Sequence, residues 1–260
     1  HRSQYGTFNV KMQKTFPNAC FIAFTGTPLM KKEKSTASKF GGIIGDPYTI
    51  MDAVEDKAVV PILYEGRHNL IEVNEKPLDT FFDKVSEPLT PYGKAKLKKK
   101  YSTTSQLNKA DQVIYARAWD ISDHFVSNFQ NTGFKGMLVA PNKTSAIRYR
   151  EYLKEIGKVS CEVLISPDDT REGNDDAYEE KDEVVKKFYK SMMDKYGTSQ
   201  KYEKAIINSF KKKETPEIII VVDKLLTGFD APVAQVLYLT RGLKEHTLLQ
   251  AIARVNRVAP

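Results

Sequence analysis

The chain has 260 residues, enough for one or two domains with substantial hydrophobic cores. Lys and Arg exceed Asp and Glu by 40 to 33, and this net charge of +7 is compatible with a nucleic-acid partner. No apolar run is long enough to cross a bilayer, and the four His lack neighbours at metal-ligand spacing, so we expect no membrane span and no metal site. Cys20 and Cys161 lie far apart in apolar, strand-like surroundings, which favours reduced thiols in a cytoplasmic protein.

The first 73 residues predict a strand, a short helix and a strand–turn–strand pair. The chain starts at His1, with neither an initiator Met nor a leader, so we expect it to be cut from something longer. The apolar run 19–24 indicates a strand buried on both faces, which the turn Thr25–Gly26–Thr27–Pro28 ends. Thr49 is a good N-cap for the short helix that follows it, and residues 58–73 predict a strand–turn–strand pair.

Residues 74–109 have little periodic apolar content, three prolines and a run of lysines, and are predicted to link two domains. The amphipathic pattern of 111–129 predicts a helix that packs on a second sheet. From Phe134 onward strands and helices alternate, which indicates a parallel sheet covered by helices. The predicted strands are 134–141, 158–165, 217–222 and 233–239, and the predicted helices between them are 146–156, 183–195 and 202–213.

The buried strand 217–222 leads into the loop Thr227–Gly228–Phe229–Asp230. Ligands of open α/β sheets bind outside the carboxyl ends of the strands, and we expect the loop to lie there. A helix from Thr247 to Val258 would align Gln250, Arg254 and Arg257 on one face, which suits a polyphosphate. Taken alone, the loop also fits an ordinary strand end, and the predicted helix with its two arginines also fits a solvated helix face.

Together, the loop and the helix indicate a function more specifically than either does alone. Leu226–Pro232, with the sequence LTGFDAP, and Gln250–Arg257, with the sequence QAIARVNR, resemble the fifth and sixth motifs of superfamily-two helicases and translocases. They are most similar to the motor subunit of type I restriction enzymes. In that family the fifth motif contacts the nucleotide ribose and the nucleic-acid backbone, and the sixth motif supplies an arginine finger.

The resemblance implies a role for each matching residue. Gly228 and Asp230 would lie near the ribose of ATP. Arg257 would be the arginine finger to the γ-phosphate, and Arg254 and Gln250 would support it. Thr227, in the same loop, would contact the DNA backbone.

Three weaker matches occur earlier in the chain. Thr25, Gly26 and Thr27 resemble the third motif, which couples nucleotide state to movement of the two lobes. His1 resembles the residue after the acidic pair of the second motif, which implies proximity to the nucleotide. If the resemblance is set aside, a tag remnant explains His1 equally well.

Asn142, Lys143 and Ser145 follow a predicted strand and resemble the fourth motif, which grips the nucleic-acid backbone. These side chains could donate hydrogen bonds to DNA phosphates. A helix cap without any nucleic-acid partner is an equally good interpretation of the same residues.

The resemblance implies a RecA-like architecture in three parts: the C-terminal part of a first motor lobe in 1–73, a linker in 74–109 and a second RecA-like lobe in 110–260. ATP and Mg²⁺ would bind between the lobes, and hydrolysis would drive translocation along double-stranded DNA before cleavage. The implied protein is a type I site-specific deoxyribonuclease, with methyltransferase and specificity subunits as partners.

The sequence contains no phosphate-binding loop of the form G-x-x-x-x-G-K-[ST], and the acidic pair of the second motif and the nuclease site are also missing. We therefore expect ATP and Mg²⁺ to be bound mainly by residues outside this sequence, and the segment alone to be inactive. Two other hypotheses stay open. One is another superfamily-two enzyme, such as a DNA-repair helicase or a type III restriction motor. The other is a non-catalytic module that docks DNA or a partner.

Overall fold

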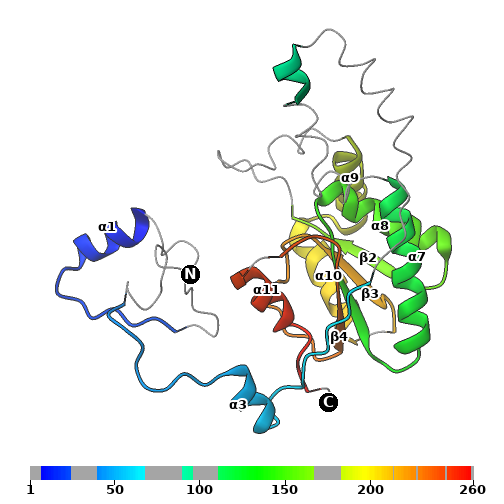
Figure 1. Ribbon diagram of the computed structural model, residues 1–260. Coiled ribbons are helices and arrows are strands. Elements are labelled where there is room, and N and C mark those ends of the chain that lie inside the picture. The colour runs from blue at the N-terminus through cyan, green and yellow to red at the C-terminus, as the bar shows by residue number, and fades with distance from the viewer. Residues whose placement is uncertain are drawn as a thin grey trace.

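The structure is a computed structural model, and it describes residues 7–24, 40–67, 90–95, 111–166, 183–212, 214–226, 228–243 and 245–258. Figure 1 shows that the described residues after 110 form one α/β body around a sheet, while two helices of the N-terminal part lie away from it. These two helices are α1 (Thr7–Thr15) and α3 (Ile50–Glu55).

A four-stranded sheet, parallel throughout, forms the centre of the body, in the order β2-β3-β1-β4. Its strands are β1 (Lys135–Val139), β2 (Cys161–Leu164), β3 (Ile218–Val221) and β4 (Ala234–Leu239). The two central strands, β1 and β3, are buried at every position, as expected for parallel strands covered on both faces. All four predicted strands are confirmed.

Within the described residues, five helices surround this sheet: α7 (Asp111–Asn128), α8 (Lys143–Ile156), α9 (Glu183–Tyr196), α10 (Ser199–Lys212) and α11 (Glu245–Ile252). α7 confirms the predicted amphipathic helix, because it buries Ile114, Ala118, Ile121 and Phe125 on one side. α8 begins after the N-cap Asn142. The α/β fold with a helix-covered parallel sheet, predicted from the alternation of strands and helices, is confirmed.

The short helix α3 has the predicted cap. The side chain of Thr49 accepts a hydrogen bond from the backbone N of Asp52 at 3.2 Å. The Asp52 carboxylate in turn accepts one from the backbone N of Thr49 at 2.7 Å. This reciprocal pair is a capping box, which satisfies two backbone donors that a helix start leaves without partners.

The strand predicted over 19–24 is wrong, since these residues form no regular secondary structure. Ile22 is 57% exposed and Phe24 is 90% exposed, and Cys20 is exposed as well. A parallel strand gains its hydrogen bonds and its burial only from neighbouring strands, and no described residue pairs with this segment. The apolar run alone was therefore insufficient to make a strand.

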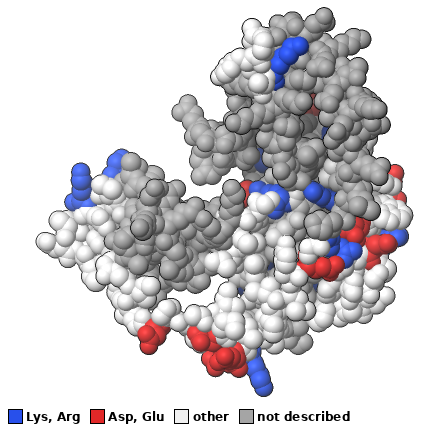
Figure 2. Space-filling model, viewed as in Figure 1, with Lys and Arg blue, Asp and Glu red and all other residues white. Residues whose placement is uncertain are grey.

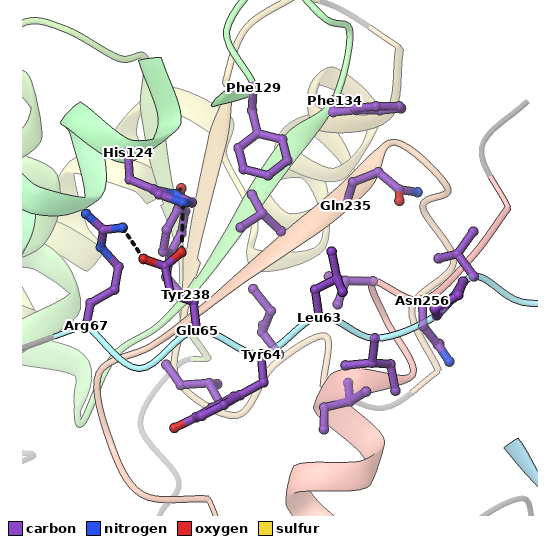
Figure 3. A pocket seen from close by; sticks show the side chains of 18 of the residues that line it. Leu63, Tyr64, Glu65, Arg67, His124, Phe129, Phe134, Gln235, Tyr238 and Asn256 are labelled. Atoms are coloured by element: carbon purple, nitrogen blue, oxygen red, sulfur yellow. Dashed lines mark hydrogen bonds and ion pairs between the residues drawn. The ribbon is translucent and has the colours of Figure 1, made fainter. Parts of the chain in front are cut away.

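The strand–turn–strand pair predicted over 58–73 also differs from the structure. Residues 60–67 form no regular secondary structure, and residues 68–73 lie outside the described part. Val59 instead forms an isolated antiparallel bridge with Arg257. We call residues 59–67 the strap, because this segment runs along the outer side of β4 (Figures 1 and 3).

The predicted linker, 74–109, lies almost wholly outside the described residues, so the domain boundaries stay predictions. Among the described residues on the face that Figure 2 shows, basic side chains occur at several separate places, with acidic side chains beside some of them. Among the described helices, none is both long and apolar enough to cross a bilayer. The described residues also contain no group of three His, Cys, Asp or Glu side chains arranged to hold a metal ion.

Candidate functional site

The two sequence stretches that suggested a function meet at the backbone carbonyl of Phe229. Arg254 donates to this oxygen from Nη1 at 2.6 Å, and Arg257 approaches it from Nη2 at 3.4 Å. Arg257 also forms an ion pair with the carboxylate of Asp230. The loop after β3 and the segment after α11 therefore form one site that contains two guanidinium groups and one carboxylate.

α11 positions the two arginines, although neither lies within it. The helix ends at Ile252, and the segment that follows makes turns before Arg257 becomes extended. The Gln250 side chain, on α11, is buried, and its backbone carbonyl accepts a hydrogen bond from Nε of Arg254 at 3.1 Å. Nε of Arg257 lies 3.4 Å from the carbonyl of Ala253.

The single helix predicted over 247–258 is thus wrong at its carboxyl end. Two tertiary contacts explain the early stop. Arg257 pairs with Val59 in a β-bridge, which requires an extended backbone at both residues. In addition, the carbonyl of Arg257 accepts a hydrogen bond from the side chain of Gln235 on β4 at 3.0 Å. Arg254 and Arg257 still converge, but through turns rather than on one helix face.

The two arginines differ in their surroundings. Burial lowers the pKa of Arg254, but an arginine starts so far above neutrality that the group stays charged. The side chain of Arg257 is 28% exposed, and that of its partner Asp230 is 69% exposed. Exposed ion pairs contribute about 0–1 kcal/mol, so an anionic ligand could replace Asp230 as the partner of Arg257 at little cost. Arg254 suits a structural role, and Arg257 suits ligand binding.

Phe229 and Asp230 do not lie at the carboxyl ends of the strands, where we predicted the loop. The Phe229 ring is 6.2 Å from the ring of Phe210 near the end of α10, and Phe210 in turn lies 5.3 Å from Nζ of Lys135, the first residue of β1. The backbone N of Lys135 also donates to the carbonyl of Val233 at 2.7 Å. Parallel strands start at the same edge, so the chain after β3 must cross back before β4 begins. Phe229 and Asp230 therefore lie near the amino ends.

Gly228 has a left-handed backbone conformation, with φ at 69°, which glycine adopts without strain. A Cβ at this position would meet no heavy atom within 4 Å, so the loop surface is open there. A ligand could approach the backbone of Gly228 closely.

The residues that resemble a fourth motif lie at the opposite, carboxyl edge of β1. Asn142 is the N-cap of α8, and its side chain accepts a hydrogen bond from the backbone N of Ser145 at 2.7 Å. Lys143 and Ser145 belong to the first turn of α8, which starts earlier than the predicted helix 146–156. Ser145 is 2% exposed and Asn142 is 8% exposed. The cap is therefore present, and the DNA contact stays a prediction, with Lys143 as the most accessible of the three.

The remaining predicted site residues are His1, Thr25, Gly26, Thr27 and Thr227. All five lie outside the residues that the structure describes. Their proposed proximity to the nucleotide, coupling and DNA contacts stay predictions.

Two features of the site were not predicted from the sequence. One is the role of the Phe229 carbonyl as hydrogen-bond acceptor, because every residue has a backbone carbonyl and a motif therefore cannot identify it. The other is a cavity of about 550 Å³ between the strap, β4 and α11, which Figure 3 shows. Its lining is mainly apolar, and Glu65, Arg67 and His124 form a polar end. In the sequence, the apolar run Ile62 to Tyr64 is a signal that could have suggested it, and in the structure these side chains are exposed.

Two family models match this sequence. One describes a SWI2/SNF2 ATPase and matches residues 1–95, and the other describes domain 3 of the type I restriction enzyme subunit R and matches residues 132–260. The ATPase match and the helix-covered parallel sheet together confirm the predicted RecA-like fold class.

Individual relatives carry similar names. A Methanocaldococcus jannaschii protein, named as a proposed type I restriction enzyme MjaVIIP endonuclease subunit, is 33% identical over 100% of this chain and 26% of its own length. The type I restriction enzyme HindI endonuclease subunit of Haemophilus influenzae is 31% identical over 99% of this chain and 24% of its own length. The chain thus spans about a quarter of each of these relatives.

Proposed function

This chain belongs to the family of type I restriction enzyme endonuclease subunits, and from that premise we propose that it is part of an ATP-driven motor that translocates double-stranded DNA. The motor would act before DNA cleavage, within a cytoplasmic complex that also contains methyltransferase and specificity subunits. Hydrolysis would take place in the complete subunit, because this chain covers only about a quarter of its relatives.

One observation carries this proposal: Arg254 and Arg257 converge on the Phe229–Asp230 loop. Phosphoryl transfer depends mainly on positioning and on neutralising negative charge, and a guanidinium beside the γ-phosphate supplies that charge. The partner of Arg257 is the exposed Asp230 carboxylate, which a ligand can replace more easily than the backbone carbonyls that Arg254 binds. Arg257 is therefore our candidate for the arginine finger. Arg254 would be a positioning residue, since it holds the loop through the carbonyl of Phe229.

The described residues fit part of an ATP site. Arg257 offers a cation for the phosphates, and the exposed carboxylate of Asp230 beside the open backbone of Gly228 can accept hydrogen bonds from a ribose. ATP when bound would supply the phosphoryl group and, with Mg²⁺, the charge that Arg257 helps to neutralise. We propose that Mg²⁺ is held by other parts of the complete subunit.

The test is DNA-stimulated ATPase activity of the complete subunit, with wild type compared with Arg257→Ala. Arginine fingers contribute about 10³–10⁵-fold in rate in related chemistry, so we expect near-complete loss of turnover. Arg148→Ala is the matched control, because it removes an arginine on α8 whose ion pair is with Asp111 on α7 and not with the Phe229–Asp230 loop. If the Arg257 variant keeps its turnover, the finger assignment is wrong and a DNA-docking or partner-docking role becomes the better proposal.

A further inference from the structure

The distal end of the strap is fastened to α7 by a cluster of charged and polar side chains. Arg67 binds the carboxylate of Asp120 with two hydrogen bonds, from Nε at 2.9 Å and from Nη2 at 2.8 Å. Glu65 accepts a third from Nη1 of Arg67 at 2.6 Å and lies 3.5 Å from Nε2 of His124. Figure 3 shows Glu65 and Arg67 pointing from the strap toward His124.

This cluster extends from α7 to the sheet. Nδ1 of His124 and the hydroxyl of Tyr238, on β4, are 2.8 Å apart and share a hydrogen bond. A guanidinium with two parallel bonds to one carboxylate fixes orientation as well as distance. Arg67 and Asp120 therefore hold the strap in one place along α7, and we call this pair the clasp.

The other end of the strap is fastened to the candidate arginine finger. Val59 bridges Arg257, and the backbone N of Val60 donates to the carbonyl of Asn256 at 3.2 Å. Between these two attachments the strap lies over the cavity described above, and Leu63 and Tyr64 are 95% and 90% exposed. The middle of the strap has little packing of its own, so its position depends on its two ends.

We propose that Arg67 and Asp120 are positioning residues for Arg257. By fixing the distal end of the strap, the clasp keeps Val59 and Val60 paired with residues 256–257, and this pairing holds the backbone that carries the Arg257 guanidinium. The inference rests on the proposed function, since Arg257 affects a reaction only if the motor hydrolyses ATP. A displacement of a reacting group by about 1 Å can cost about 10²-fold in rate, so a small shift of the strap has a measurable effect.

Steady-state ATPase kinetics of the complete subunit test the role in turnover. We expect Arg67→Ala and Asp120→Ala each to lower kcat about tenfold, a partial misplacement, with little change in KM for ATP. The double variant is expected to be no worse than either single variant, because both remove the same clasp. Asp120→Glu, which keeps the charge, restores part of the rate. Asp111→Ala is the control, since it breaks the other Arg–Asp ion pair of α7, with Arg148, and leaves the strap untouched.

Amide hydrogen exchange of the 260-residue chain tests the mechanical link without any ATP hydrolysis. In Asp120→Ala we expect faster exchange at Val60 and in residues 256–258, and in Asp111→Ala we expect none of this change. A structural role of Asp120 confined to α7 would raise exchange in the helix and leave Val60 protected.

Three outcomes are distinguishable. If Arg257→Ala abolishes turnover while the clasp variants change neither kcat nor exchange at Val60, the positioning role is wrong and the proposed function stands. If Arg257→Ala keeps its turnover, both the proposed function and the positioning role are wrong. The inference is supported if the clasp variants both lower kcat and speed amide exchange at Val60.

Discussion

Arg257 forms an ion pair with Asp230, and this contact joins the end of the described chain to the loop that precedes β4. Among the described residues, the neighbouring arginine, Arg254, forms no ion pair with a carboxylate, and it donates to the backbone carbonyls of Gln250 and Phe229. The two arginines are thus held by different chemistry, and they should respond differently to substitution.

We predict that Arg254→Ala lowers the free energy of unfolding by about 1–3 kcal/mol, because it removes the 2.6 Å hydrogen bond from a partly buried carbonyl. Arg257→Ala should cost about 0–1 kcal/mol, since its ion pair is exposed to solvent. Chemical denaturation of the 260-residue chain measures both. Equal losses for the two variants would contradict the division into a structural arginine and a ligand-binding one.

Asn142→Ala should lower stability by about 1 kcal/mol, since it deletes the N-cap of α8, and Asn142→Asp should be close to wild type because aspartate caps equally well. Thermal unfolding gives the comparison. DNA affinity, measured in parallel, separates the cap from the predicted phosphate contact. If DNA affinity falls in Asn142→Ala while the melting temperature stays constant, Asn142 acts as a phosphate contact rather than as a helix cap.

Gly136→Ala should destabilise the fold by about 1–3 kcal/mol through overpacking. Gly136 lies on β1, where a Cβ would approach side-chain atoms of Ile218 and Tyr238 at 3.3 Å each. Gly242→Ala is the matched control, because a Cβ there would meet no heavy atom within 4 Å. Denaturant midpoints for the two variants should differ clearly, and similar midpoints would show that β1 and its neighbours adjust to the added methyl group.

The two cysteines should differ in reactivity. Burial raises the pKa of the Cys161 thiol to about 12, so almost none of it is ionised at pH 8. Cys20 is exposed to solvent. Alkylation of the native chain at pH 8, followed by peptide mass analysis, should modify Cys20 and leave Cys161 intact until denaturant is added. Rapid modification of native Cys161 would mean that β2 opens readily.

The second half of the fold was predictable because its signals are local. A buried parallel strand is a run of Ile and Val, as in 218–221, and α7 repeats its apolar residues at helical spacing. The first half was less predictable because its apolar run, 19–24, could form a strand only with neighbouring strands. The sequence of a segment does not specify whether those neighbours are present.

The candidate site was predictable in its members and not in its geometry. The motifs identified Arg254, Arg257 and Asp230, and the structure brings these three together. The end of α11 at Ile252 was not predictable, because it depends on the bridge between Val59 and Arg257, two residues far apart in the chain. Contacts of this kind leave no periodic pattern in either segment.

The strap also has a consequence for solubility. β4 pairs only with β1 among the described strands, so its outer edge has backbone groups that another chain could use to extend the sheet. The strap lies beside β4, across the cavity that both of them line, and it includes Pro61, which has no backbone donor for such pairing. A shortened protein that starts after the strap would leave the edge and its apolar neighbours uncovered, and we expect it to aggregate.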